Sequence, residues 1–288
     1  MNIWAHRGCS QMYPENTITA FEKAMNIPGL AGIELDIQLT RDGELVVIHD
    51  ERVDRTTDGF GNVRDFTLSE LNNLHIYTGT EKVEHIPTMR EVFELLAPKL
   101  LKYKKGDEAG ASQGIRLNIE LKNSVYSYPG MEGKIVDMVR EFGVQDAIVY
   151  STFYADSLVR VHEIDPDAEL GVLDSKVSDC LYKAMGLERY FDERKEPPAE
   201  SSKESHEGES ADEAGSDCDK AEKSFSFALH PYGNMIDIDD AYFLNRTVRA
   251  WFSGHLFPEK STGGKLDIFK YEALGVTDFF LNEPEKYL

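Results

Sequence analysis

Hydrophobic and polar residues alternate most regularly along residues 32–39. Apolar side chains stand at every second position, namely at Ile33, Leu35, Ile37 and Leu39. A period of two predicts a β-strand, because successive side chains of a strand point to opposite faces. Glu34 and Asp36 occupy intervening positions, so we expect their carboxylates to share one face. A half-exposed edge strand with a polar outer face is the alternative interpretation.

A second apolar run, Leu45–Ile48, follows after a short link that contains Asp42-Gly43. An Asp-Gly pair between apolar runs is typical of a β-hairpin, whereas a parallel crossover needs about a dozen residues or more. We therefore expect two antiparallel strands. If 42–43 form a two-residue loop, Asp36 lies opposite His49 and their Cβ atoms are about 5 Å apart on one face. A longer loop would shift this register.

Strand-like and helix-like segments alternate along the chain. With Leu45–Asp50 counted as an accessory of the hairpin, eight strands are predicted to begin near residues 2, 32, 115, 147, 170, 226, 247 and 277. Helices are predicted from Pro14, at the capping boxes Thr67–Glu70 and Thr88–Glu91, and over 133–142, 155–164, 178–185, 239–245 and 266–274. This alternation favours the α/β class, and eight units favour a (β/α)₈ TIM barrel. An open doubly wound sheet is the alternative, but no Gly-x-Gly-x-x-Gly follows a predicted strand.

Two segments interrupt this alternation. Residues 51–87 are polar and irregular apart from one short helix, so we expect a small insertion after the second strand. Residues 188–224 are rich in Glu, Ser, Asp, Lys and Pro, and they have few apolar side chains to offset the entropy cost of ordering them. We predict that this acidic insert is disordered and lies on the surface of a single TIM-barrel domain spanning residues 1–288.

Composition and charge narrow the class of protein. The chain has 288 residues and a formal net charge of −21, which argues against binding to nucleic acid or to anionic lipid. Three cysteines without a CxxC pair suit a reducing compartment. The first residues do not have the pattern of a signal peptide, and no apolar run approaches the length of a membrane span. We expect a cytoplasmic protein without a membrane span, and composition leaves its oligomeric state open.

Charged side chains cluster at the carboxyl ends of the predicted strands, which form the active face of a TIM barrel. They are His6 and Arg7 on the first strand, Glu34 and Asp36 on the second, and Glu120 and Lys122 on the third, with His49 arriving from the hairpin. Three carboxylates can hold a divalent cation, an arginine and a lysine can hold an anion, and two histidines can transfer protons near neutral pH. Together they describe metal-assisted cleavage of a phosphoester.

Each of these residues alone has a simpler interpretation. A single histidine at a strand end is more often structural than catalytic. Arg7 can pair with a carboxylate, and Glu120-Leu121-Lys122 can be an ordinary alternating strand. The argument for a site is that the barrel brings all of these residues to one rim.

Several sequence blocks resemble those of the glycerophosphodiester phosphodiesterases. They are Ala5-His6-Arg7-Gly8, Pro14-Glu15-Asn16-Thr17, Glu34–Gly43, Val46–Asp50, Arg55-Thr56-Thr57, Phe66-Thr67-Leu68, Ile86-Pro87-Thr88, Asn118–Lys122 and Ser151-Thr152-Phe153. The similarity runs nearly from end to end, apart from the acidic insert. Near the seventh strand the family usually has Trp-Thr-Val-Asn, whereas this chain has Trp251-Phe252-Ser253-Gly254.

The resemblance implies a TIM barrel that hydrolyses glycerophosphodiesters, such as glycerophosphocholine or glycerophosphoethanolamine, to sn-glycerol 3-phosphate and an alcohol. It matches Glu34, Asp36 and Glu120 to the ligands of one divalent cation, Mg²⁺ or Ca²⁺, His6 and His49 to an acid–base pair, and Arg7 and Lys122 to phosphate-side positions, with Trp251 lining the pocket. Two other functions stay open. One is a related phospholipase that acts on lipid, and the other is a non-catalytic barrel whose acidic insert binds a basic partner.

Overall fold

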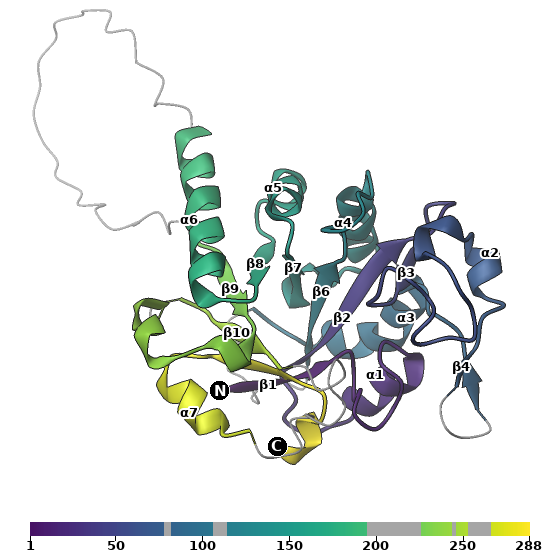
Figure 1. Cartoon of the computed structure of the whole chain (residues 1–288), viewed down its shortest axis with the longest axis horizontal. Coiled ribbons are helices and arrows are strands. Elements are labelled where there is room, and N and C mark those ends of the chain that lie inside the picture. The colour runs from purple at the N-terminus through teal and green to yellow at the C-terminus, as the bar shows by residue number, and fades with distance from the viewer. Residues whose placement is uncertain (78–81, 106–113, 195–225, 244–245, 253–265) are drawn as a thin grey trace, which may run out of the picture.

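The computed structural model describes residues 1–77, 82–105, 114–194, 226–243, 246–252 and 266–288. Within them, eight parallel strands form a barrel in the order β10-β11-β1-β2-β6-β7-β8-β9 (Figure 1). Isolated parallel bridges, Leu229 to Val248 and Tyr232 to Trp251, connect the two ends of this order. The strands are β1 Asn2–His6, β2 Gly32–Leu39, β6 Arg116–Leu121, β7 Ile148–Thr152, β8 Glu169–Asp174, β9 Ala228–Pro231, β10 Arg249–Trp251 and β11 Asp278–Leu281. The predicted TIM barrel is confirmed, and each strand begins within two residues of its expected start.

Helices surround the barrel and pack on the outward faces of the strands (Figure 1). They are α1 Ile18–Ala24, α3 Met89–Leu100, α4 Met131–Phe142, α5 Ala155–Ile164, α6 Val177–Arg194 and α7 Ile268–Ala273, with 3₁₀ helices η2 Gln145–Ala147, η3 Gly233–Met235, η4 Ile238–Phe243 and η6 Pro284–Lys286. The helix expected from Pro14 begins only at Ile18, because Asn16 has a φ of 57° and Thr17 caps the helix by accepting from the backbone N–H of Ala20. None of the helices in the described ranges has the length and apolar character needed to cross a membrane.

The hairpin after β2 forms, but its predicted register is wrong. Strand β3, Leu45–Val47, pairs antiparallel with β2, and the loop contains three residues, 41–43, rather than two. Gly43 has a φ of 81° and its N–H donates to the carbonyl of Thr40, as in a three-residue hairpin loop. The extra residue shifts the pairing by one position, so the N–H of Ile48, not that of His49, meets the carbonyl of Asp36.

The segment over 51–87 is more ordered than its polar composition indicates. It contains the 3₁₀ helix η1 Val63–Asp65, the helix α2 Leu68–Leu71, and the strands β4 Ile76–Tyr77 and β5 Val83–Glu84. Both predicted capping boxes are present, at α2 and at α3. Seven buried side chains form a small core of its own beneath this segment, namely Val46, Ile48, Val53, Val63, Leu71, Ile76 and Ile86. The segment is therefore packed onto β3 instead of lying loosely on the barrel.

Helix α6 extends to Arg194, so residues 188–194 are helical and do not belong to an irregular insert. Tertiary contacts explain the extension. Glu188 forms an ion pair with Arg246, with an oxygen–nitrogen distance of 2.7 Å, and the ring of Phe191 stacks on that of Phe227. The remainder of the predicted acidic insert, 195–224, lies outside the described residues.

The barrel interior contains an apolar layer between two charged layers. Trp4, Val149 and Phe280 form the apolar layer. Gly32 makes room for the indole of Trp4, since a Cβ atom at this position would lie 2.3 Å from the ring. The charged layer at the amino ends of the strands consists of Arg116, Glu169, Arg249 and Asp278. The other charged layer, at the carboxyl ends, is the candidate site.

Candidate active site

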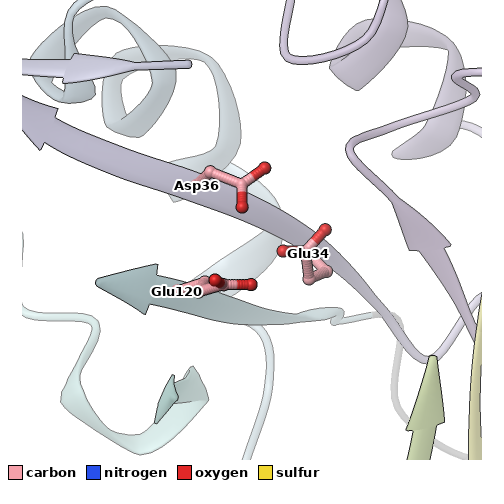
Figure 2. Close-up of side chains that lie close together, drawn as sticks. All are labelled: Glu34, Asp36 and Glu120. Atoms are coloured by element: carbon pink, nitrogen blue, oxygen red, sulfur yellow. The ribbon is translucent and has the colours of Figure 1, made fainter. Parts of the chain in front are cut away.

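Glu34 and Asp36 lie on β2 and Glu120 on the adjacent β6, and Figure 2 shows the three side chains close together on these neighbouring strands. One oxygen atom of each carboxylate lies within 4.8 Å of the others. The strand register explains the cluster, because Asp36 is paired with Glu120 and Glu34 lies two residues earlier on the same face. The edge-strand alternative is wrong, since β2 lies between β1 and β6 and the Glu34 and Asp36 side chains are 3% and 0% exposed.

The electrostatics of this cluster favour a bound cation. Burial raises the pKa of Glu34 well above its usual value, and repulsion from Asp36 adds to the shift. Burial also acts to raise the pKa of Asp36, but the attractions of Arg7, His49 and Lys122, with the hydrogen bond from Asn16, together outweigh it and lower this pKa. The buried Oδ1 atom of Asp36 has no hydrogen-bond partner among the described residues. Because hard divalent ions prefer carboxylate oxygens, the donor set fits one such ion.

Arg7 lies against the same carboxylates. Its Nε atom is 3.2 Å from Asp36 Oδ2, and its NH1 group donates to Glu15 Oε1 at 3.0 Å. Arg7 has a φ of 58°, a conformation that is costly for a residue with a Cβ atom. In this conformation its backbone N–H donates to Glu34 Oε2 at 3.0 Å. The side chain and the main chain of Arg7 therefore both hold the acidic cluster in place.

Lys122 directly follows β6 and is buried beside Glu120. Its Nζ atom donates to Glu120 Oε1 at 3.0 Å and lies 3.2 Å from His49 Nε2. Burial lowers the pKa of Lys122, but Glu120 and Asp36 outweigh this effect and raise the pKa above its usual value. Lys122 is thus a permanent positive charge next to a histidine.

The two histidines of the predicted acid–base pair approach the cluster from different elements. His6 ends β1, and its Nδ1 atom lies 2.8 Å from Asn282 Oδ1, while its Nε2 atom lies 3.8 Å from Glu34 Oε2. His49 follows β3, and its Nδ1 atom lies 2.6 Å from Asp50 Oδ1. A carboxylate only accepts hydrogen bonds, so Nδ1 of His49 carries a proton. In both rings Nε2 is the nitrogen that faces the site.

A cavity of about 80 Å³ opens beside these groups. Its lining includes six of the eight predicted site residues, namely His6, Arg7, Glu34, His49, Glu120 and Trp251. Asp36 and Lys122 lie behind them, in contact with Arg7 and Glu120. Part of the cavity wall is apolar and consists of Phe153, Leu173, Phe280 and Trp251. The indole N–H of Trp251 is buried and has no partner among the described residues, so this wall also offers a hydrogen-bond donor.

The sequence analysis did not identify the polar residues that hydrogen-bond to the predicted site residues and to their backbone. The Nδ2 group of Asn16 donates to Asp36 Oδ2 at 2.8 Å, and Asn282 holds His6. The Nε2 group of Gln38 lies within hydrogen-bond distance of the carbonyls of residues 48, 49 and 50. This contact fixes the backbone on both sides of His49, whose ring lines the cavity although the hairpin register is shifted. Gln38 and Asn16 lie inside sequence blocks of the resemblance, which was the available signal.

Comparisons with known proteins agree with this geometry. A model of the glycerophosphoryl diester phosphodiesterase family matches residues 6–252. The chain is 44% identical over 192 residues to a glycerophosphodiester phosphodiesterase of Caldanaerobacter subterraneus subsp. tengcongensis, covering 65% of this chain and 73% of the relative. It is 41% identical over 178 residues to a glycerophosphodiester phosphodiesterase of Bacillus altitudinis, covering 61% of this chain and 67% of the relative.

The fold is similar to that of an Oleispira antarctica phosphodiesterase solved in complex with the product sn-glycerol-3-phosphate. The TM-score is 0.68 and the identity 21%, over 99% of this chain and 94% of that chain. A Galdieria sulphuraria protein described as a putative glycerophosphodiester phosphodiesterase has a TM-score of 0.67 at 19% identity, over 99% of this chain and 95% of that chain. Since the family model spans most of the sequence, the chain belongs to the glycerophosphoryl diester phosphodiesterase family of hydrolases.

Proposed function

We propose that this chain hydrolyses glycerophosphodiesters, such as glycerophosphocholine or glycerophosphoethanolamine, to sn-glycerol 3-phosphate and an alcohol. The observation that carries the proposal is the convergence of three buried carboxylates and two histidines on one small cavity. The names of the relatives and the product bound to the Oleispira antarctica phosphodiesterase support the same substrate class.

Glu34, Asp36 and Glu120 are proposed to hold one divalent cation, Mg²⁺ or Ca²⁺. When bound, such an ion polarises a phosphoryl oxygen and stabilises the charge that develops on it. The three carboxylates together carry a charge of −3, and Arg7 and Lys122 together carry +2, so the cluster has a net charge of −1. A divalent ion makes that balance positive, which suits an anionic phosphodiester.

Arg7 and Lys122 are proposed to contact the phosphate. A guanidinium group binds phosphate oxygens as a planar fork and an ammonium group binds them as a point charge. Trp251 and the apolar wall are proposed to receive the glycerol side of the substrate, with the indole N–H donating to a substrate oxygen.

His6 and His49 are proposed to act as the acid–base pair through their Nε2 atoms. One ring accepts the proton of the attacking oxygen and the other gives a proton to the leaving alcohol. The fixed Nδ1 contacts, to Asn282 and to Asp50, keep both Nε2 atoms directed at the cavity.

The test is the release of glycerol 3-phosphate from several glycerophosphodiesters, with intact phospholipid vesicles as a comparison substrate. EDTA should abolish turnover, and Mg²⁺ or Ca²⁺ should restore it. His6→Ala and His49→Ala should each lower kcat by about 10²–10⁴-fold. His75→Ala is the matched control, because His75 is half-exposed and pairs with Asp58 in the 51–87 segment. Turnover that survives both EDTA and the two site variants would refute the proposal.

A further inference from the structure

One arginine outside the cavity binds two carboxylates, each of which contacts a different residue of the site. Arg55 lies in the 51–87 segment and is not among the described residues that line the cavity. Its Nε and NH2 groups donate to the two oxygens of Asp50, at 2.6 and 3.0 Å. Its NH1 and NH2 groups donate to the two oxygens of Glu15, at 2.8 and 2.6 Å. A single guanidinium group therefore forms a bidentate pair with each of two carboxylates.

Each of these carboxylates also binds a residue of the site. Asp50 Oδ1 lies 2.6 Å from His49 Nδ1, and Glu15 Oε1 accepts from Arg7 NH1 at 3.0 Å. Hydrogen-bond donors and acceptors alternate along this chain of contacts, from His49 through Asp50, Arg55 and Glu15 to Arg7. Without the guanidinium group, two carboxylates would face each other without a shared counter-charge.

An ordinary surface ion pair does not account for this arrangement. Exposed pairs contribute about 0–1 kcal/mol and need no particular geometry. The Arg55 side chain is 38% exposed, and the Asp50 and Glu15 side chains that it binds are 29% and 9% exposed. Glu15 in turn binds Arg7, whose side chain is only 5% exposed. Bidentate pairs fix direction as well as distance, so the position of Arg55 determines where both carboxylates point.

We propose that Arg55 is a positioning residue, which holds Asp50 against His49 and Glu15 against Arg7 and so fixes the histidine and the arginine relative to each other. The proposal rests on the proposed function, in which His49 transfers a proton and Arg7 binds the phosphate. The two carboxylates have different roles. Asp50 fixes the His49 ring with Nδ1 protonated and Nε2 facing the cavity, and Glu15 fixes the guanidinium plane of Arg7.

The main test compares Arg55→Met with Arg52→Met. Arg52 lies in the same segment and has a similar exposure, but it pairs with Asp54 and lies over the ring of Phe60. We expect Arg55→Met to lower kcat and to raise KM, with a combined loss in kcat/KM of about 10–100-fold, whereas Arg52→Met stays close to wild type. Asp50→Asn should act mainly on kcat and Glu15→Gln mainly on KM.

Two further measurements separate positioning from general damage to the fold. Added guanidinium ion, at concentrations far below those that unfold the protein, should restore part of the kcat of Arg55→Met, with NaCl as the salt control. Arg55→Lys keeps the charge but cannot form two bidentate pairs, so it should remain well below wild type in kcat/KM. It also serves as the test variant if Arg55→Met does not fold.

The proposal also has a readout that does not need substrate. In NMR spectra of ¹⁵N-histidine-labelled protein, the His49 ring signals should show a protonated Nδ1 in wild type and in Arg52→Met, and should shift in Arg55→Met. The proposal is overturned if Arg55→Met matches Arg52→Met in kcat, KM and the His49 signals. A wild type that releases no glycerol 3-phosphate from any diester overturns the proposed function instead, and the NMR comparison still decides whether Arg55 orients His49.

Discussion

The substitution Gln38→Leu tests how the site obtains its second histidine. Gln38 is fully buried on β2. Its Nε2 group lies 3.1, 3.1 and 2.6 Å from the carbonyl oxygens of Ile48, His49 and Asp50, and its Oε1 atom accepts from the hydroxyl of Tyr128 at 2.9 Å. The side chain thus binds the carbonyls of residues 48–50, where the pairing of β3 with β2 ends after the N–H of Ile48.

The expected loss of stability in Gln38→Leu follows from the hydrogen bonds that leucine cannot make. An amide NH₂ group has two protons, so it forms two good hydrogen bonds at a time among the three carbonyls. Each buried acceptor left without a partner costs about 1–3 kcal/mol, and we expect a loss of about 2–4 kcal/mol in the free energy of unfolding. Freeing the backbone of His49 also displaces its ring, and a shift of about 1 Å in a catalytic group lowers kcat by about 10²-fold.

The assay combines urea unfolding with steady-state kinetics under conditions where each variant is folded. Tyr128→Phe is the matched control, because it removes only the hydroxyl that donates to Gln38 Oε1. We expect it to cost about 1 kcal/mol and to change kcat little, since the carboxamide still holds the carbonyls. The reasoning is wrong if Gln38→Leu is as stable and as active as Tyr128→Phe.

Three other substitutions test the charges and the cavity wall. Burial acts to raise the pKa of Glu169, but Arg249 and Arg116 outweigh it and bring this pKa to about 2, below its usual value of 4.5. The ionised Glu169 therefore stabilises wild type above about pH 4.5, and this contribution is lost as the pH falls to about 2. It amounts to about 1–2 kcal/mol after a discount for the 34% exposure of the side chain, and it is missing from Glu169→Gln at every pH. Urea unfolding of both proteins at pH 7 and pH 3 checks this. Asp36→Asn should weaken Mg²⁺ or Ca²⁺ binding by at least about tenfold in calorimetric titration, and an unchanged affinity would exclude Asp36 as a ligand. Trp251→Phe should raise KM by about 3–10-fold with a smaller change in kcat, whereas an unchanged KM would argue against a substrate contact.

Much of the site could be predicted because parallel strands impose a common direction. Once the alternation along β2 and the eight strand–helix units are recognised, the carboxyl ends of all strands must meet at one mouth of the barrel. Glu34, Asp36 and Glu120 need no further information, since a period of two and the neighbouring positions of β2 and β6 bring them together. The observed cluster of the three carboxylates agrees with this reasoning.

The features that could not be predicted depend on contacts between segments far apart in the sequence. The hairpin register differs because Gly43 adopts a positive φ and Asp42 does not, whereas a two-residue type I′ loop needs a positive φ at both, and the Asp-Gly pair allows either loop. The extension of α6 depends on Arg246 and Phe227, which lie beyond the acidic stretch. Asn282 is 276 residues from its partner His6, and no local pattern connects the two.

The layered interior of the barrel separates charges that stabilise the fold from charges that carry the proposed chemistry. Asp278 and Phe280 lie two residues apart on β11 and face the same interior, as do Arg249 and Trp251 on β10. The first residue of each pair belongs to the ion network at the amino ends of the strands, and the second lines the cavity. Trp4, Val149 and Phe280 lie between the two networks. Glu169→Gln should therefore change stability while leaving kcat unchanged, and a large kcat effect would mean that the two charged layers are coupled.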